Sequence, residues 1–255
     1  MAERPLVTGA LDVPAEHHQG EHVSADRPPH SGPLTAPKVV FFDVNETLSD
    51  LSSMGTYFER VGAPSHLAGM WFAALLRDGF ALAATGRMVA FADIAAAGLR
   101  TLFAGVALDR SVEDAVSEVM SGFHELDVHA DVPAGIPLLA ELELRLVTLS
   151  NGSASVAEAL LGRAGVRQHF DRLLSVEAAG VWKPSAQAYS YGLVSCAVDP
   201  AEALLVAVHP WDIDGAARAG LSTAWLNRAG LPYPGYFTSP TMELGSLPEL
   251  AVQLR

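Results

Sequence analysis

Residues 38–50 read K-V-V-F-F-D-V-N-E-T-L-S-D, and this stretch decides the fold. The run from Val39 to Phe42 is continuous and apolar, and its β-branched and aromatic residues are typical of a strand buried on both faces. Asp43 follows at once and is therefore predicted at the carboxyl end of that strand, where open parallel sheets bind their ligands. Thr47 adds a hydroxyl group four residues later. Taken alone, this spacing is equally typical of an aspartate that caps the next helix, so the rest of the chain has to decide.

The composition excludes several classes of function. The chain has 255 residues, half of them apolar, which suffices for one substantial α/β domain and a smaller insertion. Its 29 acidic residues outnumber its 16 basic ones, and no cluster of five lysines or arginines occurs. Nucleic acid and anionic membranes are therefore not expected as partners. Charged residues interrupt the alanine-rich middle, so no membrane span is predicted. The single cysteine, Cys196, excludes an internal disulfide, predicts a buried thiol rather than a nucleophile, and fits a cytoplasmic location.

The beginning of the chain differs from the rest. Residues 1–37 contain six prolines and four histidines and have no periodic apolar pattern. We therefore predict a disordered leader over residues 1–37. It lacks the apolar segment of a secretory signal, and the irregular spacing of its histidines does not favour a metal site.

The central part of the chain has a helical pattern. Within residues 52–128, apolar and small residues recur at helical spacing, as in Leu67, Met70, Trp71 and Leu75. No strand pattern precedes Leu144, so residues 52–128 are predicted to form an all-helical insertion, the cap. Strands and helices then alternate, which indicates a mostly parallel sheet with right-handed crossovers. The later strands are expected at residues 144–149, 173–176, 204–208 and 222–226.

Two helix starts carry capping signals. Ser155 and Glu158 have the spacing of a capping box at the start of one crossover helix. Ser246 is expected to cap a short final helix over residues 247–254. Residues 38–51 and 129–255 together are predicted to form the α/β core, with the active site in the crevice between core and cap.

Polar side chains follow the predicted strands, and their spacing predicts a site. The carboxyl ends of parallel strands meet at one edge of a sheet, so these side chains are expected to converge. The set comprises the carboxylates Asp43 and Asp212, the hydroxyls of Thr47 and Ser150, the amide of Asn151, the cation Lys183 and the imidazole of His209. A carboxylate in a water-poor crevice can attack carbon or phosphorus and form an ester, and a nearby lysine would keep it ionised.

In order and in strand context, these residues resemble the four motifs of the haloacid dehalogenase (HAD) superfamily, hydrolases that use an aspartate nucleophile. The resemblance covers about residues 38–230, and the closer match is to the type II L-2-haloacid dehalogenase group. It is carried by L-S-N-G-S at 149–153, K-P at 183–184 with Tyr189 beyond it, W-D at 211–212 and W-L-N-R at 225–228. The resemblance implies a Rossmann-like, HAD-like α/β core with an inserted helical cap.

The resemblance also implies roles for individual residues. Asp43 is expected to attack the substrate, Lys183 to stabilise negative charge, and Asp212 to orient the water that hydrolyses the ester, with His209 as a second candidate for that role. His209 is equally compatible with a structural position beside Pro210. The residues expected to bind the substrate are Thr47, Ser150, Asn151, Phe72, Tyr189 and Trp211.

Two substitutions bear on the type of reaction. HAD phosphatases have a second aspartate two residues after the nucleophile, which protonates the leaving alcohol, and this chain has Asn45 there. They also hold Mg²⁺ with an acidic residue four positions before the last motif aspartate, and this position is Val208. Both changes favour a leaving group that is already a stable anion, such as halide. We therefore expect no metal or other cofactor, with Mg²⁺ implied only for a phosphatase.

Other positions depart from the dehalogenase pattern. Type II dehalogenases have an arginine directly after a cap tryptophan, whereas Phe72 follows Trp71 here and Arg77 lies six residues beyond Trp71. In the last motif, Ala207 and His209 replace serine and asparagine.

We predict an enzyme that removes halide from a small 2-haloacid through an aspartyl ester. The alternatives are a HAD phosphatase of narrow scope, acting on acyl or aryl phosphates, and a degenerate HAD-fold binding protein. The expected partner is a small anionic substrate. The sequence does not decide whether the chain forms a homodimer.

Overall fold

The computed structural model describes residues 36–255, and the leader predicted over residues 1–37 lies outside them except for its last two residues. A six-stranded parallel sheet forms the core, in the order β3-β2-β1-β4-β5-β6. The central strand, β1, pairs with β2 on one side and β4 on the other. The strands are β1 Val39–Phe42, β2 Arg145–Ser150, β3 Phe170–Ser175, β4 Ala203–Ala207, β5 Ser222–Leu226 and β6 Met242–Leu244.

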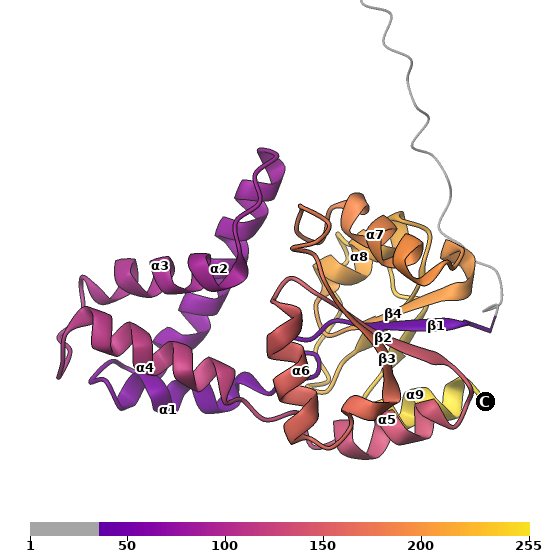
Figure 1. Cartoon of the computed structure of the whole chain (residues 1–255), viewed down its shortest axis with the longest axis horizontal. Helices are drawn as coiled ribbons and strands as arrows, with labels where there is room; N and C mark the ends of the chain where they lie inside the picture. The colour runs from indigo at the N-terminus through magenta and orange to yellow at the C-terminus, as the bar shows by residue number, and fades with distance from the viewer. Residues whose placement is uncertain (1–35) are drawn as a thin grey trace, which may run out of the picture.

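Helices cover both faces of this sheet (Figure 1). Successive side chains of a strand point to opposite faces, and β1 shows this alternation. Val39 and Phe41 belong to the apolar cluster that includes α7 and α8, whereas Val40 and Phe42 belong to the cluster that includes α5 and α9. All four side chains are fully buried, which explains the continuous apolar run in the sequence. The helices are α5 Val132–Ala140, α6 Ala154–Arg163, α7 Ala186–Cys196, α8 Pro210–Arg218 and α9 Leu247–Gln253.

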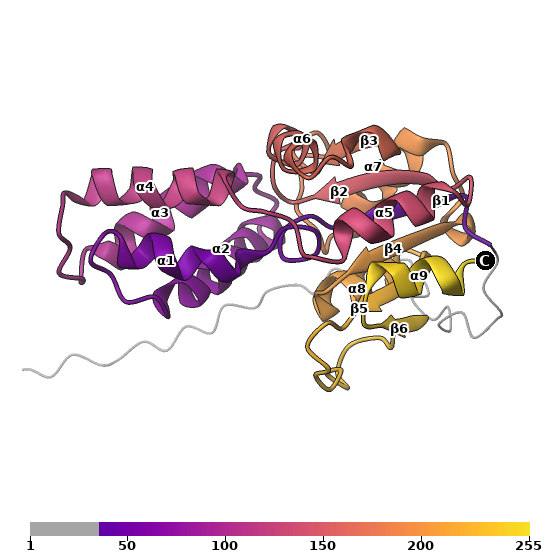
Figure 2. The same ribbon diagram turned by 90° about the horizontal axis from the view of Figure 1, so that it is seen from below.

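The chain between β1 and α5 forms a separate helical layer beside the sheet (Figure 2). This layer has its own aromatic core around Trp71, whose ring lies about 6 Å from Phe58 and Phe123 and whose Nε1 donates to the Ala95 carbonyl. Its helices are α1 Met54–Glu59, α2 Leu67–Ala84, α3 Phe91–Phe103 and α4 Val112–His124. By length and composition alone, α2 is apolar enough to cross a membrane, but its Trp71 and Phe72 are buried against this layer. The division into cap and core at residues 52 and 128 stays a prediction.

Aromatic side chains join the helical layer to the sheet domain. Phe91 stacks on Trp182 with ring centroids 5.7 Å apart, and Trp182 Nε1 donates to the carbonyl of Val89. Gly79 of α2 faces the same ring so closely that a Cβ atom there would lie 2.3 Å from it. Phe80 meets the ring of Trp211 at 4.9 Å. The tryptophan before Lys183 and the tryptophan before Asp212 therefore fix α2 and α3 over the carboxyl edge of the sheet.

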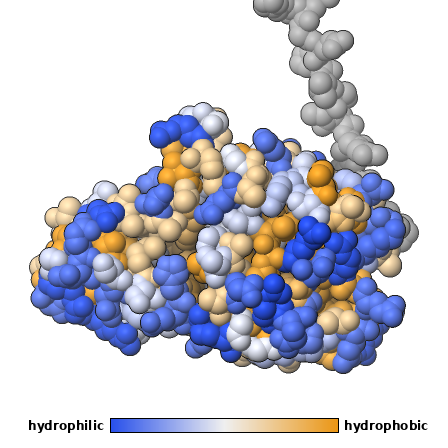
Figure 3. Space-filling model, in the orientation of Figure 1, coloured by the Kyte–Doolittle hydropathy of each residue, from blue (hydrophilic) through white to orange (hydrophobic). Residues whose placement is uncertain are grey.

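The space-filling view shows hydrophilic side chains over most of one face, with smaller hydrophobic groups between them (Figure 3).

The predicted α/β fold class is confirmed, and most elements lie where the sequence places them. The capping box at Ser155 is wrong, because Ser153 is the N-cap of α6 and its Oγ accepts the N–H of Val156. The cap at Ser246 is confirmed by its bond from the N–H of Glu249. Strand β3 starts at Phe170 rather than at residue 173, because an edge strand tolerates exposed charged residues that break the apolar pattern. The short edge strand β6 was not predicted. The described 3-10 turns are Leu51–Ser53, Arg167–His169 and Pro200–Glu202.

Candidate active site

Asp43 lies directly after β1 and is 3% exposed. Its Oδ1 accepts a hydrogen bond from Lys183 Nζ at 2.9 Å, and its Oδ2 accepts one from Thr47 Oγ1 at 2.7 Å. His209 Nδ1 lies 3.2 Å from the same Oδ2. Burial alone would raise the pKa of Asp43, but the charge of Lys183 and the hydrogen bond from His209 outweigh burial and hold it well below its usual range. Asp43 is therefore a buried, ionised carboxylate at neutral pH.

Lys183 joins two carboxylates in the interior. Its Nζ lies 2.6 Å from Asp212 Oδ2 as well as 2.9 Å from Asp43 Oδ1, and its side chain is fully buried. Burial alone would lower the pKa of Lys183, but Asp212 and Asp43 raise it, so the ammonium stays charged. Burial raises the pKa of Asp212, and the charge of Lys183, which lowers it, offsets only part of that rise. Tyr189 donates to Asp212 Oδ1 at 2.7 Å, which leaves both oxygens of Asp212 bonded.

Three polar groups fix this arrangement through the backbone. Asn151 bonds both backbone groups of Lys183, with its Oδ1 accepting from Lys183 N at 2.9 Å and its Nδ2 donating to Lys183 O at 3.3 Å. Ser150 Oγ accepts the N–H of Gly152, which shapes the turn after β2. Thr47 Oγ1 accepts the N–H of Val208, so its own proton is directed at Asp43. These hydroxyl and amide groups are thus occupied by bonds within the protein.

His209 lies between two carboxylates. Its Nε2 is 2.8 Å from Glu46 Oε2, its Nδ1 faces Asp43, and its ring stacks on Trp211 with centroids 5.0 Å apart. Burial alone would lower the pKa of His209, but the hydrogen bonds to Asp43 and Glu46 raise it to about 9. A protonated imidazole has no lone pair with which to take a proton from water, so this geometry does not support a role as base in the unreacted enzyme.

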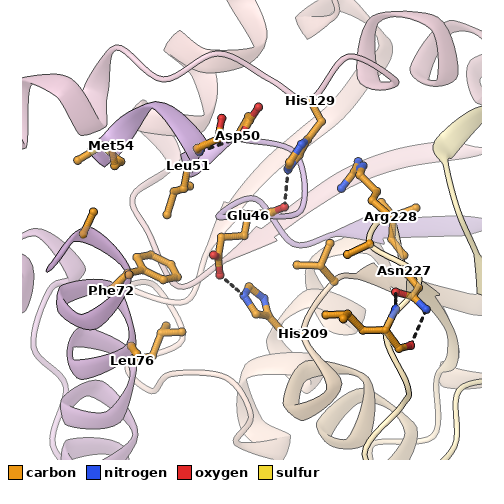
Figure 4. A pocket seen from close by; sticks show the side chains of 18 of the residues that line it. Glu46, Asp50, Leu51, Met54, Phe72, Leu76, His129, His209, Asn227 and Arg228 are labelled. Carbon is orange, nitrogen blue, oxygen red and sulfur yellow. Dashed lines mark hydrogen bonds and ion pairs between the residues drawn. The ribbon is translucent and has the colours of Figure 1, made fainter. Parts of the chain in front are cut away.

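A pocket of about 630 Å³ opens beside His209 and Glu46, a size typical of sites for small molecules (Figure 4). Its walls come from the loop after β1, from helix α2 and from the turn after β5. Asp43 is not among the lining residues, and His209 touches both the pocket and Asp43. The apolar wall includes Leu51, Met54, Trp71, Phe72 and Leu76, and the polar wall includes Glu46, His129, His209, Asn227 and Arg228.

The predicted site residues divide into two groups. The structure brings Asp43, Thr47, Lys183, His209 and Asp212 together around one carboxylate. Of the residues expected to bind the substrate, Phe72 lines the pocket. The lining residues do not include the others, which are Thr47, Ser150, Asn151, Tyr189 and Trp211.

Two arginines and one glutamate differ in how they lie relative to this pocket. Arg77 is 71% exposed at its side chain, pairs with Asp78 and is not among the residues that line the pocket. Arg228 lines the pocket and pairs with Asp131, and its Nη1 has no hydrogen-bond partner among the described residues. Sequence reasoning missed Glu46, whose charged side chain four residues after a strand gave no signal of its own.

The donor set does not fit a hard divalent cation. Such an ion requires several free oxygen ligands in near-octahedral geometry. The facing oxygens of Asp43 and Asp212 are bridged by the Lys183 ammonium, and Val208 offers no side-chain oxygen. Within residues 36–255, no group of three or more histidine, cysteine, aspartate or glutamate side chains is arranged to hold a metal.

The fold and the charges define an α/β protein with a buried, ionised carboxylate at the carboxyl edge of a parallel sheet. A family model described as haloacid dehalogenase-like hydrolase matches residues 37–220. The chain belongs to this hydrolase family.

Comparisons with individual proteins agree with this assignment. The chain is 28% identical over 212 residues to an (S)-2-haloacid dehalogenase of Pseudomonas sp. (strain YL), covering 82% of this chain and 91% of that protein. It is 26% identical to haloacetate dehalogenase H-2 of Moraxella sp. (strain B), covering 84% and 93%. Among solved structures, the L-2-haloacid dehalogenase of Xanthobacter autotrophicus superposes with a TM-score of 0.78 at 24% identity, covering 86% of this chain and 98% of that one. This last similarity concerns the fold alone.

The pKa of His209 predicts how stability depends on pH. A histidine whose folded-state pKa is raised stabilises the folded protein fully below the unfolded value of 6.5, and this contribution is lost as pH rises through about 9. A rise from 6.5 to about 9 corresponds to about 3 kcal/mol. We expect the free energy of unfolding, measured in urea, to fall between these pH values. The fall should be much smaller in His209→Asn, and equal slopes in the two proteins would contradict the assignment.

Proposed function

We propose that this protein removes halide from a small 2-haloacid by forming a covalent ester at Asp43. The observation that carries the proposal is the ionised, nearly water-free carboxylate of Asp43, which is paired with Lys183 and contacts His209 in the wall of a largely apolar pocket. A carboxylate is a weak nucleophile in water, and removal from water increases its reactivity. The names of the relatives, (S)-2-haloacid dehalogenase and haloacetate dehalogenase, support the same chemistry.

The reaction has two steps. In the first, an oxygen of Asp43 bonds to C2 of the substrate with inversion, and the electron pair of the carbon–halogen bond leaves with the halide. In the second, water attacks Cγ of Asp43 and releases a 2-hydroxy acid. Halide is a stable anion that needs no acid for departure, and Asn45 could not serve as one. A phosphatase would need both that acid and a bound cation, so the geometry favours dehalogenation.

The pocket has positive charge available for an anionic substrate. Thr47 and Asn151, which the sequence suggested for this purpose, are bonded within the protein. Arg228 lines the pocket, and its Nη1, which is buried, has no hydrogen-bond partner among the described residues. We therefore assign contact with the substrate carboxylate to Arg228, which also pairs with Asp131. Phe72 would contribute apolar contact. A cytoplasmic location and a homodimer stay predictions.

A substrate panel tests the proposal. We expect the purified protein to release halide from (S)-2-chloropropionate in excess chelator and to release no phosphate from aryl or acyl phosphates. Ion chromatography measures the halide, and a colorimetric assay measures the phosphate. Phosphate release that requires Mg²⁺, without halide release, would refute dehalogenation and establish the phosphatase alternative.

A further inference from the structure

The two oxygens of Asp43 differ in the lone pairs that they have available. A carboxylate oxygen has about two lone-pair sites for hydrogen bonds. Oδ2 accepts from both Thr47 and His209, whereas among the described residues Oδ1 has only Lys183 as a partner. Oδ1 therefore retains a lone pair for attack on the substrate, and Oδ2 becomes the carbonyl oxygen of the resulting ester.

Hydrolysis of that ester places negative charge on Oδ2. When water attacks Cγ, the carbonyl electron pair moves to this oxygen, and preorganised donors aimed at it lower the barrier. Thr47 Oγ1 is already 2.7 Å away and His209 Nδ1 is 3.2 Å away. Thr47 Oγ1 accepts the N–H of Val208 on one side and donates its own proton to Oδ2 on the other. Both donors thus lie where the second step needs them.

Glu46 determines whether His209 can act as a donor after Asp43 has reacted. Esterification removes the charge of Asp43, and Glu46 is then the carboxylate that still contacts the imidazole, at 2.8 Å from Nε2. Among the described residues, Asp43 and Glu46 are the charged groups that bond the ring, and the other charged or titratable groups nearby make no hydrogen bond or ion pair with it. Lys183 Nζ is 5.9 Å from the Trp211 ring on which His209 stacks, and His129 and Arg228 line the same pocket.

The backbone of Glu46 also suggests that its side chain is retained for function. Its φ angle is +61°, in the left-handed region that costs free energy for a residue with a Cβ atom. Glycine would adopt this angle without that cost. Strain of this kind is typical of functional sites, where the side chain is needed despite it.

We propose that Thr47 and His209 form the oxyanion site for hydrolysis of the Asp43 ester, and that Glu46 is the positioning residue that keeps the His209 ring oriented and protonated. This inference rests on the proposed function. It replaces the role of base for His209 with that of a cationic donor.

The second step consumes one water molecule and returns Asp43 to its carboxylate form. The water oxygen bonds to Cγ, and the pair on Oδ2 then returns as the bond between Cγ and Oδ1 breaks. Oδ1 leaves with the substrate carbon and takes one water proton to become the product hydroxyl. The second water proton is released to solvent together with the halide of the first step. His209 and Thr47 keep their protons throughout.

The test separates formation of the ester from its breakdown. Each protein is mixed with (S)-2-chloropropionate, quenched in acid and measured by intact-protein mass spectrometry across a pH series. In the wild type, we expect ester breakdown to slow as pH rises through the pKa of His209. In Glu46→Gln, this decline should occur about one pH unit lower or more, and the ester should accumulate at neutral pH while its rate of formation changes little. Glu46→Gly should behave in the same way.

Two controls exclude a general loss of structure. Glu46→Gly should still unfold cooperatively near the wild-type temperature, because relief of the strain at φ +61° offsets part of the lost contact with His209. Glu141→Gln, an exposed carboxylate on the far side of the sheet domain, should leave both rates and the pH profile unchanged. Unchanged breakdown in both Glu46 variants would overturn the inference, and so would breakdown that accelerates with rising pH, because that result assigns His209 as a base. An absence of halide release by the wild type, together with an absence of any ester in the wild type and both Glu46 variants, would refute the proposed function itself.

Discussion

Asp43→Asn should lose more than about 10³-fold in turnover while keeping the fold, because an amide has nearly the shape of a carboxylate but is a far weaker nucleophile. Asp43 is the group on which Lys183, Thr47 and His209 converge, so no neighbouring carboxylate can replace it in the same position. Halide release under saturating 2-chloropropionate measures the loss, and circular dichroism with thermal melting measures the fold. Retention of more than about a tenth of the wild-type turnover would show that another group attacks the substrate.

Lys183→Met should be the most destabilising single substitution in the site. It leaves Asp43 and Asp212, which are 3% and 0% exposed, without the cation between them. Removal of one partner from a buried ion pair costs about 3–5 kcal/mol. We expect that loss in the free energy of unfolding at pH 7, measured in urea. The loss should shrink as pH falls toward 5, because one carboxylate can then take up a proton and no longer needs a cation.

A surface lysine provides the matched control. Lys38 pairs with Glu202 at 2.6 Å, but its side chain is 68% exposed. Exposed ion pairs are screened by water and contribute little, so Lys38→Met should change the free energy of unfolding little. The double variant Lys183→Met with Asp212→Asn should recover part of the lost stability. Equal losses in Lys38→Met and Lys183→Met would contradict the electrostatic account of the site.

The sequence predicted the sheet and the carboxylate cluster because their signals are local. The buried run before Asp43, and the polar residues after β2 and β4, each lie at a strand end that the chain itself marks. Parallel pairing then brings Asp43, Lys183 and Asp212 to one edge, although Lys183 and Asp43 are 140 residues apart in sequence. The edge strands were harder to predict, because exposure on an edge removes the continuous apolar pattern that identified β1.

The pairing of Glu46 with His209 could not be predicted from sequence. The two residues are 163 positions apart, and the backbone at Glu46 is left-handed although the residue there is neither a glycine nor an asparagine. The sequence also left His209 open between a base and a structural residue. The protonation state of His209 depends on the carboxylates of Asp43 and Glu46, and only the three-dimensional arrangement shows that both contact the ring.

The central claim is that Asp43 forms an ester that water hydrolyses at Cγ. A single turnover in water labelled with oxygen-18, with enzyme in excess over 2-chloropropionate, tests it most directly. The account predicts unlabelled 2-hydroxypropionate, because the hydroxyl oxygen comes from Asp43, and a peptide spanning Asp43 that carries the heavy oxygen. Labelled product with an unlabelled peptide would mean that water displaces the halide directly, which would contradict the account.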